Sequence, residues 1–211
     1  MSARSAVRLG LDFDNTIVSY DSLFHKVARE GGWIPPDVPV SKVSVRDYLR
    51  RIGKEDVWTE MQGYVYGPRM AEAEMFPGVR EFMRWARGTG LRFCIISHKT
   101  RHPFLGPRYD LHEAARAWVE RSLRDDDGPF VALADVYFEL TKEEKLARIA
   151  ALGCNMYVDD LPEILLAETF PKQAEPVLFD PDGHHADSGL RRVPDWASLK
   201  RMVEARWRPN R

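Results

Sequence analysis

The stretch Leu11-Asp12-Phe13-Asp14-Asn15-Thr16-Ile17 decides how the rest of the chain is interpreted. It closes a short apolar run, residues 7–13, of the kind that forms a buried strand. Side chains alternate between faces along a strand, yet Asp12 and Asp14 lie where the apolar run ends. Both carboxylates can therefore project from the carboxyl end of the strand into one crevice.

The remaining chain alternates between strand patterns and helix patterns. Further strands are predicted at residues 91–96, 136–140, 156–158 and 176–179. Helices are predicted to begin after Pro77, at the capping residues Asp110 and Thr141, and at Asp195. This alternation predicts an α/β fold, in which a parallel sheet has helices on both faces.

Residues 19–75 break the alternation. They contain three helical patterns, at residues 20–30, 44–52 and 56–73, and a Pro-rich connector at residues 33–40. A loop between a strand and a helix usually has two to six residues, so this segment is too long for one. We expect a small helical domain inserted after the first strand, with residues 1–18 and 76–211 forming the core.

A second pair of carboxylates, Asp159 and Asp160, follows the apolar run Tyr157-Val158. Ligands of open α/β sheets bind outside the carboxyl ends of the strands, where the strand order reverses. If the first and fourth strands flank that point, these two carboxylates converge with Asp12 and Asp14. The alternative is that Asp-Asn-Thr is only a turn signal and Asp159-Asp160 only a helix N-cap pair.

Four converging carboxylates require a cation, because their repulsion would otherwise raise the pKa of at least one of them. Hard oxygen ligands suit Mg²⁺, which binds one or two protein carboxylates together with water and a substrate phosphate. With the phosphate held in this way, one aspartate can attack phosphorus and a second can move the proton of the leaving group.

Four segments in order resemble the four motifs of the haloacid dehalogenase-like superfamily, which contains Mg²⁺-dependent phosphohydrolases. Asp12-Phe13-Asp14-Asn15-Thr16-Ile17 resembles the first motif, Cys94-Ile95-Ile96-Ser97 the second, Lys142 or Lys145 the third, and Asp159-Asp160 the fourth. The resemblance implies a Rossmann-like three-layer fold with a parallel sheet of order 3-2-1-4-5. It also implies that residues 19–75 form a helical cap, which the superfamily places between the first two motifs.

The resemblance also implies a role for each matched residue. Asp12 would be the nucleophile and a metal ligand, and Asp14 the general acid and base, with its main-chain carbonyl on the metal. Ser97 would hydrogen-bond the transferring phosphoryl group, and the lysine would neutralise charge. Asp159 would bind Mg²⁺, with Asp160 as a further ligand or a supporting partner.

Two lysines compete for the third motif. Lys142 is preferred because it directly follows the Thr141 cap, close to the expected crevice. Lys145 is the second candidate, since a helical side chain leans toward the N-terminus and Lys145 can reach back. Asp14 favours a phosphatase over a dehalogenase, because dehalogenases of the superfamily lack an acid at that position.

Residues that could bind the substrate come from the first motif, the basic loop after Ser97 and the predicted cap. Thr16, His98, Lys99 and Arg101 are the candidates outside the cap; a solvated basic loop is the alternative for the last three. The cap candidates for specificity are Phe24, Trp33, Trp58, Tyr64, Tyr66 and Arg69.

Composition limits the class of protein. The 211 residues include 31 Lys and Arg against 32 Asp and Glu, a net charge of −1, which argues against nucleic-acid binding through bulk positive charge.

No apolar stretch approaches the roughly 18 residues of a membrane span, and Cys94 and Cys154 do not have the spacing of metal ligands. We expect a cytoplasmic protein with two buried thiols that acts on a small phosphorylated metabolite, without nucleic-acid or membrane partners. A phosphomutase or phosphotransferase, and a non-catalytic binding module of the same fold, are the alternatives; the oligomeric state is not indicated.

Overall fold

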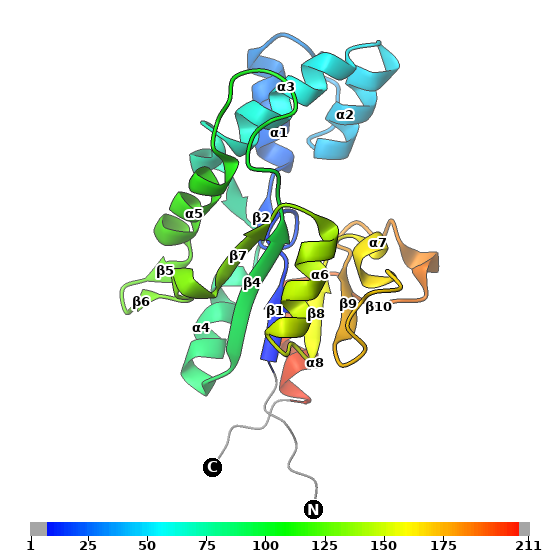
Figure 1. Cartoon of the computed structure of the whole chain (residues 1–211). Coiled ribbons are helices and arrows are strands. Elements are labelled where there is room, and N and C mark those ends of the chain that lie inside the picture. Colours follow the sequence, from blue (N-terminus) through cyan, green and yellow to red (C-terminus); the bar gives the residue numbers. More distant parts are fainter. Residues whose placement is uncertain (1–7, 207–211) are drawn as a thin grey trace, which may run out of the picture. The chain divides into compact units, whose positions relative to one another are not determined.

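The structure, a computed structural model, describes residues 8–206; the predicted first strand position, residue 7, lies outside this range. The chain divides into two compact units (Figure 1). Within the described residues, the sheet unit contains 8–17, Met75–His98 and 123–206, and the helical unit contains Val18–Glu74 and Lys99–Ser122.

The sheet unit is built on six strands. They are β1 (Arg8–Leu11), β4 (Arg92–His98), β7 (Val136–Glu139), β8 (Met156–Asp159), β9 (Glu175–Phe179) and β10 (Arg191–Val193). Their order is β10-β9-β8-β1-β4-β7, and the neighbouring strands are parallel. This confirms the predicted 3-2-1-4-5 order and adds β10 as a sixth strand at one edge. The strand order reverses between β1 and β8, and in open α/β sheets ligands bind at the carboxyl ends of the strands at such a point.

One face of the sheet packs against α6 (Lys142–Ala151) and α7 (Pro162–Leu165), which lie in front of the sheet in Figure 1. Ile96 of β4 and Tyr157 and Leu178 of β8 and β9 form a buried cluster with side chains of these helices. Cys94 and Cys154 lie in the same cluster as free thiols, with their sulfur atoms 3.8 Å apart. This confirms the prediction of two buried thiols.

The other face packs against α4 (Val79–Thr89) and α8 (Trp196–Glu204). Because side chains alternate along β9, Phe179 points away from Leu178, and its ring centroid lies 6.2 Å from that of Trp196 in α8. Trp196 in turn packs edge-on against Phe82 of α4 at 5.1 Å. The sheet therefore has helices on both faces, as predicted.

Local sequence explains where α6 begins. Thr141 accepts a hydrogen bond from the Glu144 backbone N–H, and the Glu144 carboxylate accepts one from the Thr141 backbone N–H. This capping box satisfies N–H groups that the first helical turn leaves unpaired. It fixes the start of α6 next to the carboxyl end of β7, so that the helix runs back along the sheet.

The helical unit contains α1 (Asp21–Glu30), α2 (Lys42–Arg51), α3 (Glu55–Tyr66), the short 3-10 helix η1 (Met70–Glu72) and α5 (Leu111–Ser122). Phe24 and Trp58, predicted as specificity candidates, are buried against each other with ring centroids 4.9 Å apart. Both are therefore core residues of this unit.

The sequence prediction assigned residues 99–122 to the core, whereas the structure groups them with the helical unit. The reason is long-range packing: the indole N–H of Trp118 in α5 donates to the carbonyl of Ala73 at 2.9 Å. Arg121 of the same helix donates to the carbonyl of Ala71 at 2.8 Å. The helical unit thus consists of two chain segments and not one insertion.

The remaining elements are short. They are β2 (Val18–Ser19) with β3 (Glu74–Met75), the hairpin of β5 (Arg124–Asp125) with β6 (Gly128–Pro129), and the 3-10 helices η2 (Leu133–Asp135) and η3 (Ala186–Ser188). None of the helices in the described range is long and apolar enough to cross a membrane.

Candidate active site

Two aspartates meet at the carboxyl edge of the sheet because their strands are neighbours. Leu11, the last residue of β1, is in register with Val158 of β8. The next residues are Asp12 and Asp159, and the Asp12 backbone N–H donates to the Val158 carbonyl at 2.9 Å. These two residues are 3% and 0% exposed, so two carboxylates are buried where the sequence predicts a crevice.

Lys145 joins these two carboxylates. Its Nζ lies 2.6 Å from Asp12 Oδ1 and 2.6 Å from Asp159 Oδ2, and the side chain is only 2% exposed. Burial alone would lower the pKa of Lys145, but the adjacent charges of Asp12 and Asp159 raise it above its usual value. The Lys145 ammonium therefore lies between two carboxylates that favour its charged form.

Lys142, which the sequence prediction preferred for this role, lies elsewhere. Its Nζ pairs with Glu163 Oε1 at 2.6 Å, and the side chains are 44% and 59% exposed. The lean of helical side chains toward the N-terminus explains the difference. That lean brings the Lys145 ammonium to the carboxylates of Asp12 and Asp159. Lys142 is the first residue of α6, one turn earlier, and its ammonium lies beyond them at Glu163.

Asp160 completes a cluster of three carboxylates. Asp12, Asp159 and Asp160 each offer an oxygen within 4.8 Å of the others. Asn15 donates from Nδ2 to Asp160 Oδ2 at 3.2 Å, and it does so from a left-handed backbone with φ of 55°, which Asn tolerates better than most residues. The turn signal of the first motif thus has a structural role, which is to orient the third carboxylate.

The charges of this cluster fit a divalent cation. Burial raises the pKa of Asp12 well above its usual value, and Asp159 and Asp160 raise it further, while Lys145 opposes them. Lys145 contacts two of the three carboxylates, those of Asp12 and Asp159. Oxygen ligands that are close together and negatively charged match the preference of Mg²⁺.

Ser97 and His98 lie at the end of β4, which pairs with β1 on the side away from β8. Ser97 is 1% exposed, and the His98 ring hydrogen-bonds the Leu140 backbone carbonyl. Burial, Lys145 and Lys142 lower the pKa of His98, while the Leu140 carbonyl and Asp14 oppose the shift. Ser97, His98 and Asp14 are therefore at the same edge of the sheet as the carboxylate cluster.

The structure does not place every predicted residue in this cluster. Arg101 is in the helical unit, where its side chain is 64% exposed and its Nε pairs with Asp110 at 3.0 Å. Lys99 also belongs to the helical unit. Thr16 is fully buried, its carbonyl accepts from the Trp196 indole at 3.1 Å, and its hydroxyl has no hydrogen-bond partner within residues 8–206.

Tyr157 supports Lys145 and was not predicted as a site residue. Its ring centroid lies 5.6 Å from Lys145 Nζ, and its hydroxyl donates to the Ile96 carbonyl. The ring lies against Gly10 so closely that a Cβ on Gly10 would be 2.5 Å from Tyr157 Cδ2. In the sequence Tyr157 is only one member of an apolar run, so no local signal marks it.

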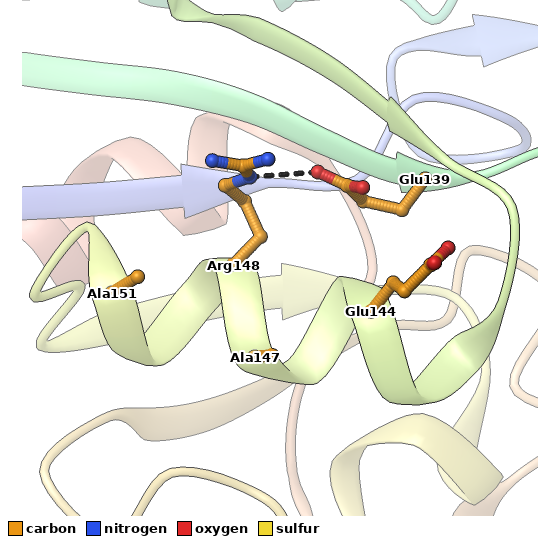
Figure 2. A pocket seen from close by; sticks show the side chains of 5 residues that line it. All are labelled: Glu139, Glu144, Ala147, Arg148 and Ala151. Carbon is orange, nitrogen blue, oxygen red and sulfur yellow. Dashed lines mark hydrogen bonds and ion pairs between the residues drawn. The ribbon is translucent and has the colours of Figure 1, made fainter.

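A separate hollow lies on α6 and contains none of the residues discussed as catalytic (Figure 2). It is lined by Glu139, Glu144, Ala147, Arg148 and Ala151. Figure 2 shows Arg148 and Glu139 pointing toward each other, and Arg148 Nε pairs with Glu139 Oε1 at 2.7 Å. The Glu144 carboxylate accepts from the Thr141 backbone N–H, so all three charged side chains of the hollow serve the local structure. The carboxylate cluster is therefore the candidate active site.

The structure is similar over nearly its whole length to solved hydrolases. A haloacid dehalogenase-like family hydrolase from Streptococcus pneumoniae has a TM-score of 0.60 at 11% identity, with 95% of this chain and 98% of that chain covered. A predicted phosphatase from Clostridium acetobutylicum has a TM-score of 0.58 at 13% identity, with 95% and 99% covered. A HAD family hydrolase from Deinococcus radiodurans, solved with bound phosphate and sodium, has a TM-score of 0.56 at 16% identity, with 94% and 95% covered.

These similarities define the class of fold. The chain has the haloacid dehalogenase-like fold, and the structure brings residues of the four predicted motifs to one edge of its sheet. No protein-family model and no curated protein matches the sequence.

Proposed function

We propose that the protein is a Mg²⁺-dependent phosphohydrolase that removes the phosphoryl group from a small phosphorylated metabolite through an aspartyl-phosphate on Asp12. The observation that carries the proposal is the buried Lys145 held 2.6 Å from both Asp12 and Asp159 at the carboxyl edge of the sheet. A buried charge cluster costs folding free energy, and a catalytic role explains why such a cluster is present.

In the first step, an oxygen of Asp12 attacks phosphorus and the bond from phosphorus to the leaving oxygen breaks. The positive charge of Lys145 favours the carboxylate form of Asp12, because it opposes the rise in pKa that burial causes. The carboxyl group of Asp14 gives its proton to the leaving oxygen, so the product leaves as an alcohol. The phosphoryl group is then bound to Asp12.

In the second step, water attacks the phosphoaspartate. Asp14, now a carboxylate, takes a proton from the water, the bond from phosphorus to the Asp12 oxygen breaks, and inorganic phosphate is released. Asp12 returns as a carboxylate and Asp14 as an acid. Ser97 is proposed to donate a hydrogen bond to the phosphoryl oxygens in both steps, which positions the group for attack.

The metal ligands are proposed to be Asp12, Asp159 and Asp160, together with the Asp14 carbonyl. The mutual proximity of the three carboxylates supports this assignment. Mg²⁺ bound there would offset the negative charge of the phosphoryl oxygens.

We propose that the helical unit selects the leaving group, as a cap does. The chain enters this unit after Ile17, three residues beyond Asp14, and again after His98, which follows Ser97. Both segments of the unit are therefore covalent continuations of loops that carry proposed catalytic residues. Loops at the carboxyl ends of strands commonly carry specificity.

The test is phosphate release from a panel of sugar phosphates, nucleotides and phosphorylated acids, with Mg²⁺ and with a chelator. Asp12→Asn is the inactive variant, and Asp126→Asn, an exposed carboxylate between β5 and β6, is the matched control. We expect release that requires Mg²⁺, is lost in Asp12→Asn and is retained in Asp126→Asn. Release that survives the chelator or Asp12→Asn would contradict the proposal.

A phosphotransferase or phosphomutase would use the same first step and pass the phosphoryl group to an acceptor other than water. Product analysis separates the two, because only hydrolysis yields stoichiometric inorganic phosphate. A non-catalytic binding module would bind phosphorylated ligands and release none of their phosphate.

A further inference from the structure

One buried tyrosine crosses the middle of the sheet. Tyr157 of β8 is fully buried, and it is in register with Gly10 of the neighbouring strand β1. Its hydroxyl donates to the carbonyl of Ile96 in β4, which lies on the far side of β1 (Figure 1). The side chain therefore connects two strands that are not neighbours in the sheet.

The crossing is possible because Gly10 has no side chain. A Cβ at this position would lie 2.5 Å from Cδ2 of the Tyr157 ring and 3.1 Å from the Cys154 sulfur. At Gly10 the middle strand thus presents only backbone to the ring. The glycine of β1 and the tyrosine of β8 act as a pair, and only together do they let the hydroxyl reach β4.

The hydroxyl reaches the part of β4 that extends past its pairing with β1. Within the described part of the chain, the last residue of β4 in register with β1 is Ile95, whereas β4 continues to His98. The Ile96 carbonyl belongs to the same planar peptide group as the Ser97 backbone N–H. The hydrogen bond from Tyr157 therefore fixes the orientation of the peptide that leads into Ser97.

The face of the same ring lies near the Lys145 ammonium. Lys145 Nζ is 5.6 Å from the Tyr157 ring centroid, within the range of a cation–π interaction, and 2.6 Å from Asp12 Oδ1. Burial raises the pKa of the Tyr157 hydroxyl well above its usual value, and nearby carboxylates raise it further, so the hydroxyl stays protonated and remains a donor. One side chain thus contacts both the ammonium beside the proposed nucleophile and the peptide before Ser97.

We propose that Tyr157 is a positioning residue for phosphoryl transfer. Through the Ile96 carbonyl it fixes Ser97, and its ring packs under Lys145, so the two groups are held at a set distance from each other. Tyr157 is not proposed to touch the reacting atoms; it acts through the hydrogen bond that Ser97 gives to the phosphoryl group. This inference rests on the proposed phosphohydrolase function and deepens it, because a small misplacement of such a donor lowers the rate.

The first experiment removes a hydroxyl from each of two tyrosines of the sheet unit. Tyr157→Phe keeps the ring under Lys145, and Tyr137→Phe is the matched control on β7, a half-buried tyrosine whose ring centroid lies 4.7 Å from the Arg148 guanidinium. We expect Tyr157→Phe to lower kcat for phosphate release about 10-fold with little change in KM, because the aligned donor matters most in the transition state. Tyr137→Phe should keep both constants of the wild type. Circular dichroism should show that both variants are folded, since both keep the ring.

A double-mutant cycle decides whether Tyr157 acts through Ser97. Ser97→Ala removes the hydroxyl that Tyr157 is proposed to position, so Tyr157→Phe should have almost no further effect on kcat in that background. A general loosening of the fold would instead lower kcat by the same factor with and without Ser97. An undiminished loss in the Ser97→Ala background, or wild-type kcat in Tyr157→Phe, would overturn the inference and leave the proposed function standing.

A binding measurement tests the inference even if the protein releases no phosphate. Orthovanadate takes up the five-coordinate geometry of a transferring phosphoryl group, and its affinity is measured by calorimetric titration in the presence of Mg²⁺. We expect Tyr157→Phe to bind it about 10-fold more weakly than the wild type or Tyr137→Phe, and the difference to vanish in the Ser97→Ala background. That result without phosphate release would support the inference and contradict the proposed hydrolysis. Equal affinity of the wild type and Tyr157→Phe, or no binding by either, would overturn the inference.

Discussion

Replacing Lys145 by methionine tests how the active site is held together. The substitution keeps the length of the side chain but removes the cation between Asp12 and Asp159, which are 3% and 0% exposed. Removing one partner of a buried ion pair typically costs about 3–5 kcal/mol, because a buried charge is left uncompensated. For a chain of this size each kcal/mol lowers Tm by about 2–4 °C, so we expect a fall of roughly 6–20 °C.

The pH dependence of this loss has a definite sign. Without Lys145, burial and the nearby charges of Asp159 and Asp160 raise the pKa of Asp12 in the folded state above its value in the unfolded chain. The stability that such groups contribute is full below the unfolded pKa and is lost as the pH rises through the folded pKa. The deficit of Lys145→Met relative to wild type should therefore shrink when the pH is lowered from about 7.5 to about 5.

The assay is thermal unfolding followed by circular dichroism, with a chelator present so that bound cations do not contribute. Lys142→Met is the matched control on the same helix, and its exposed ion pair with Glu163 should account for less than about 1 kcal/mol. If Lys145→Met loses no more stability than Lys142→Met, or if its deficit grows as the pH falls, the assignment of Lys145 to a buried cluster of carboxylates is wrong.

Further perturbations test the metal ligands, the proton donor, the packing under Lys145 and the cap of α6. Mg²⁺ at 100 times its Kd should add about 2.7 kcal/mol, or roughly 5–10 °C in Tm by calorimetry, and Asp160→Asn should reduce this rise; no Mg²⁺ effect would contradict the ligand assignment. Asp14→Asn should lower kcat by a factor of about 10²–10⁴ in the phosphate-release assay, and an unchanged rate would exclude it as the acid and base. Gly10→Ala should cost about 1–3 kcal/mol in urea unfolding, because the added Cβ would lie 2.5 Å from Tyr157, and a neutral effect would contradict that close packing. Thr141→Ala should cost about 1 kcal/mol by the same measurement through loss of the capping box, while a loss well below that would show that the cap contributes little.

Much of the sheet could be predicted because its strands are buried on both faces. An apolar run that ends in carboxylates marks both the strand and its functional end, as at Leu11-Asp12 and Val158-Asp159. Parallel pairing then brings those ends to one edge. The strand β10 was not predicted, because it lies at the sheet edge and begins with two exposed residues, Arg191 and Arg192, instead of an apolar run.

What could not be predicted depends on packing between distant residues. Lys142 and Lys145 lie on nearly the same helical face, and only the position of α6 along the sheet decides which reaches Asp12. Likewise, α5 resembles any amphipathic helix of an α/β core. It belongs to the helical unit because Trp118 donates to the Ala73 carbonyl, a contact across 45 residues of chain.

The most direct test of the proposed mechanism is the identity of the phosphorylated residue. The protein is mixed with a labelled substrate and Mg²⁺, quenched in acid within one turnover, and digested for peptide mapping by mass spectrometry. We expect one labelled peptide, phosphorylated on Asp12 and missing in Asp12→Asn. Asp14→Asn should accumulate more label, because water is no longer activated. Phosphate release without labelled protein, or label on another residue, would contradict a phosphoenzyme on Asp12.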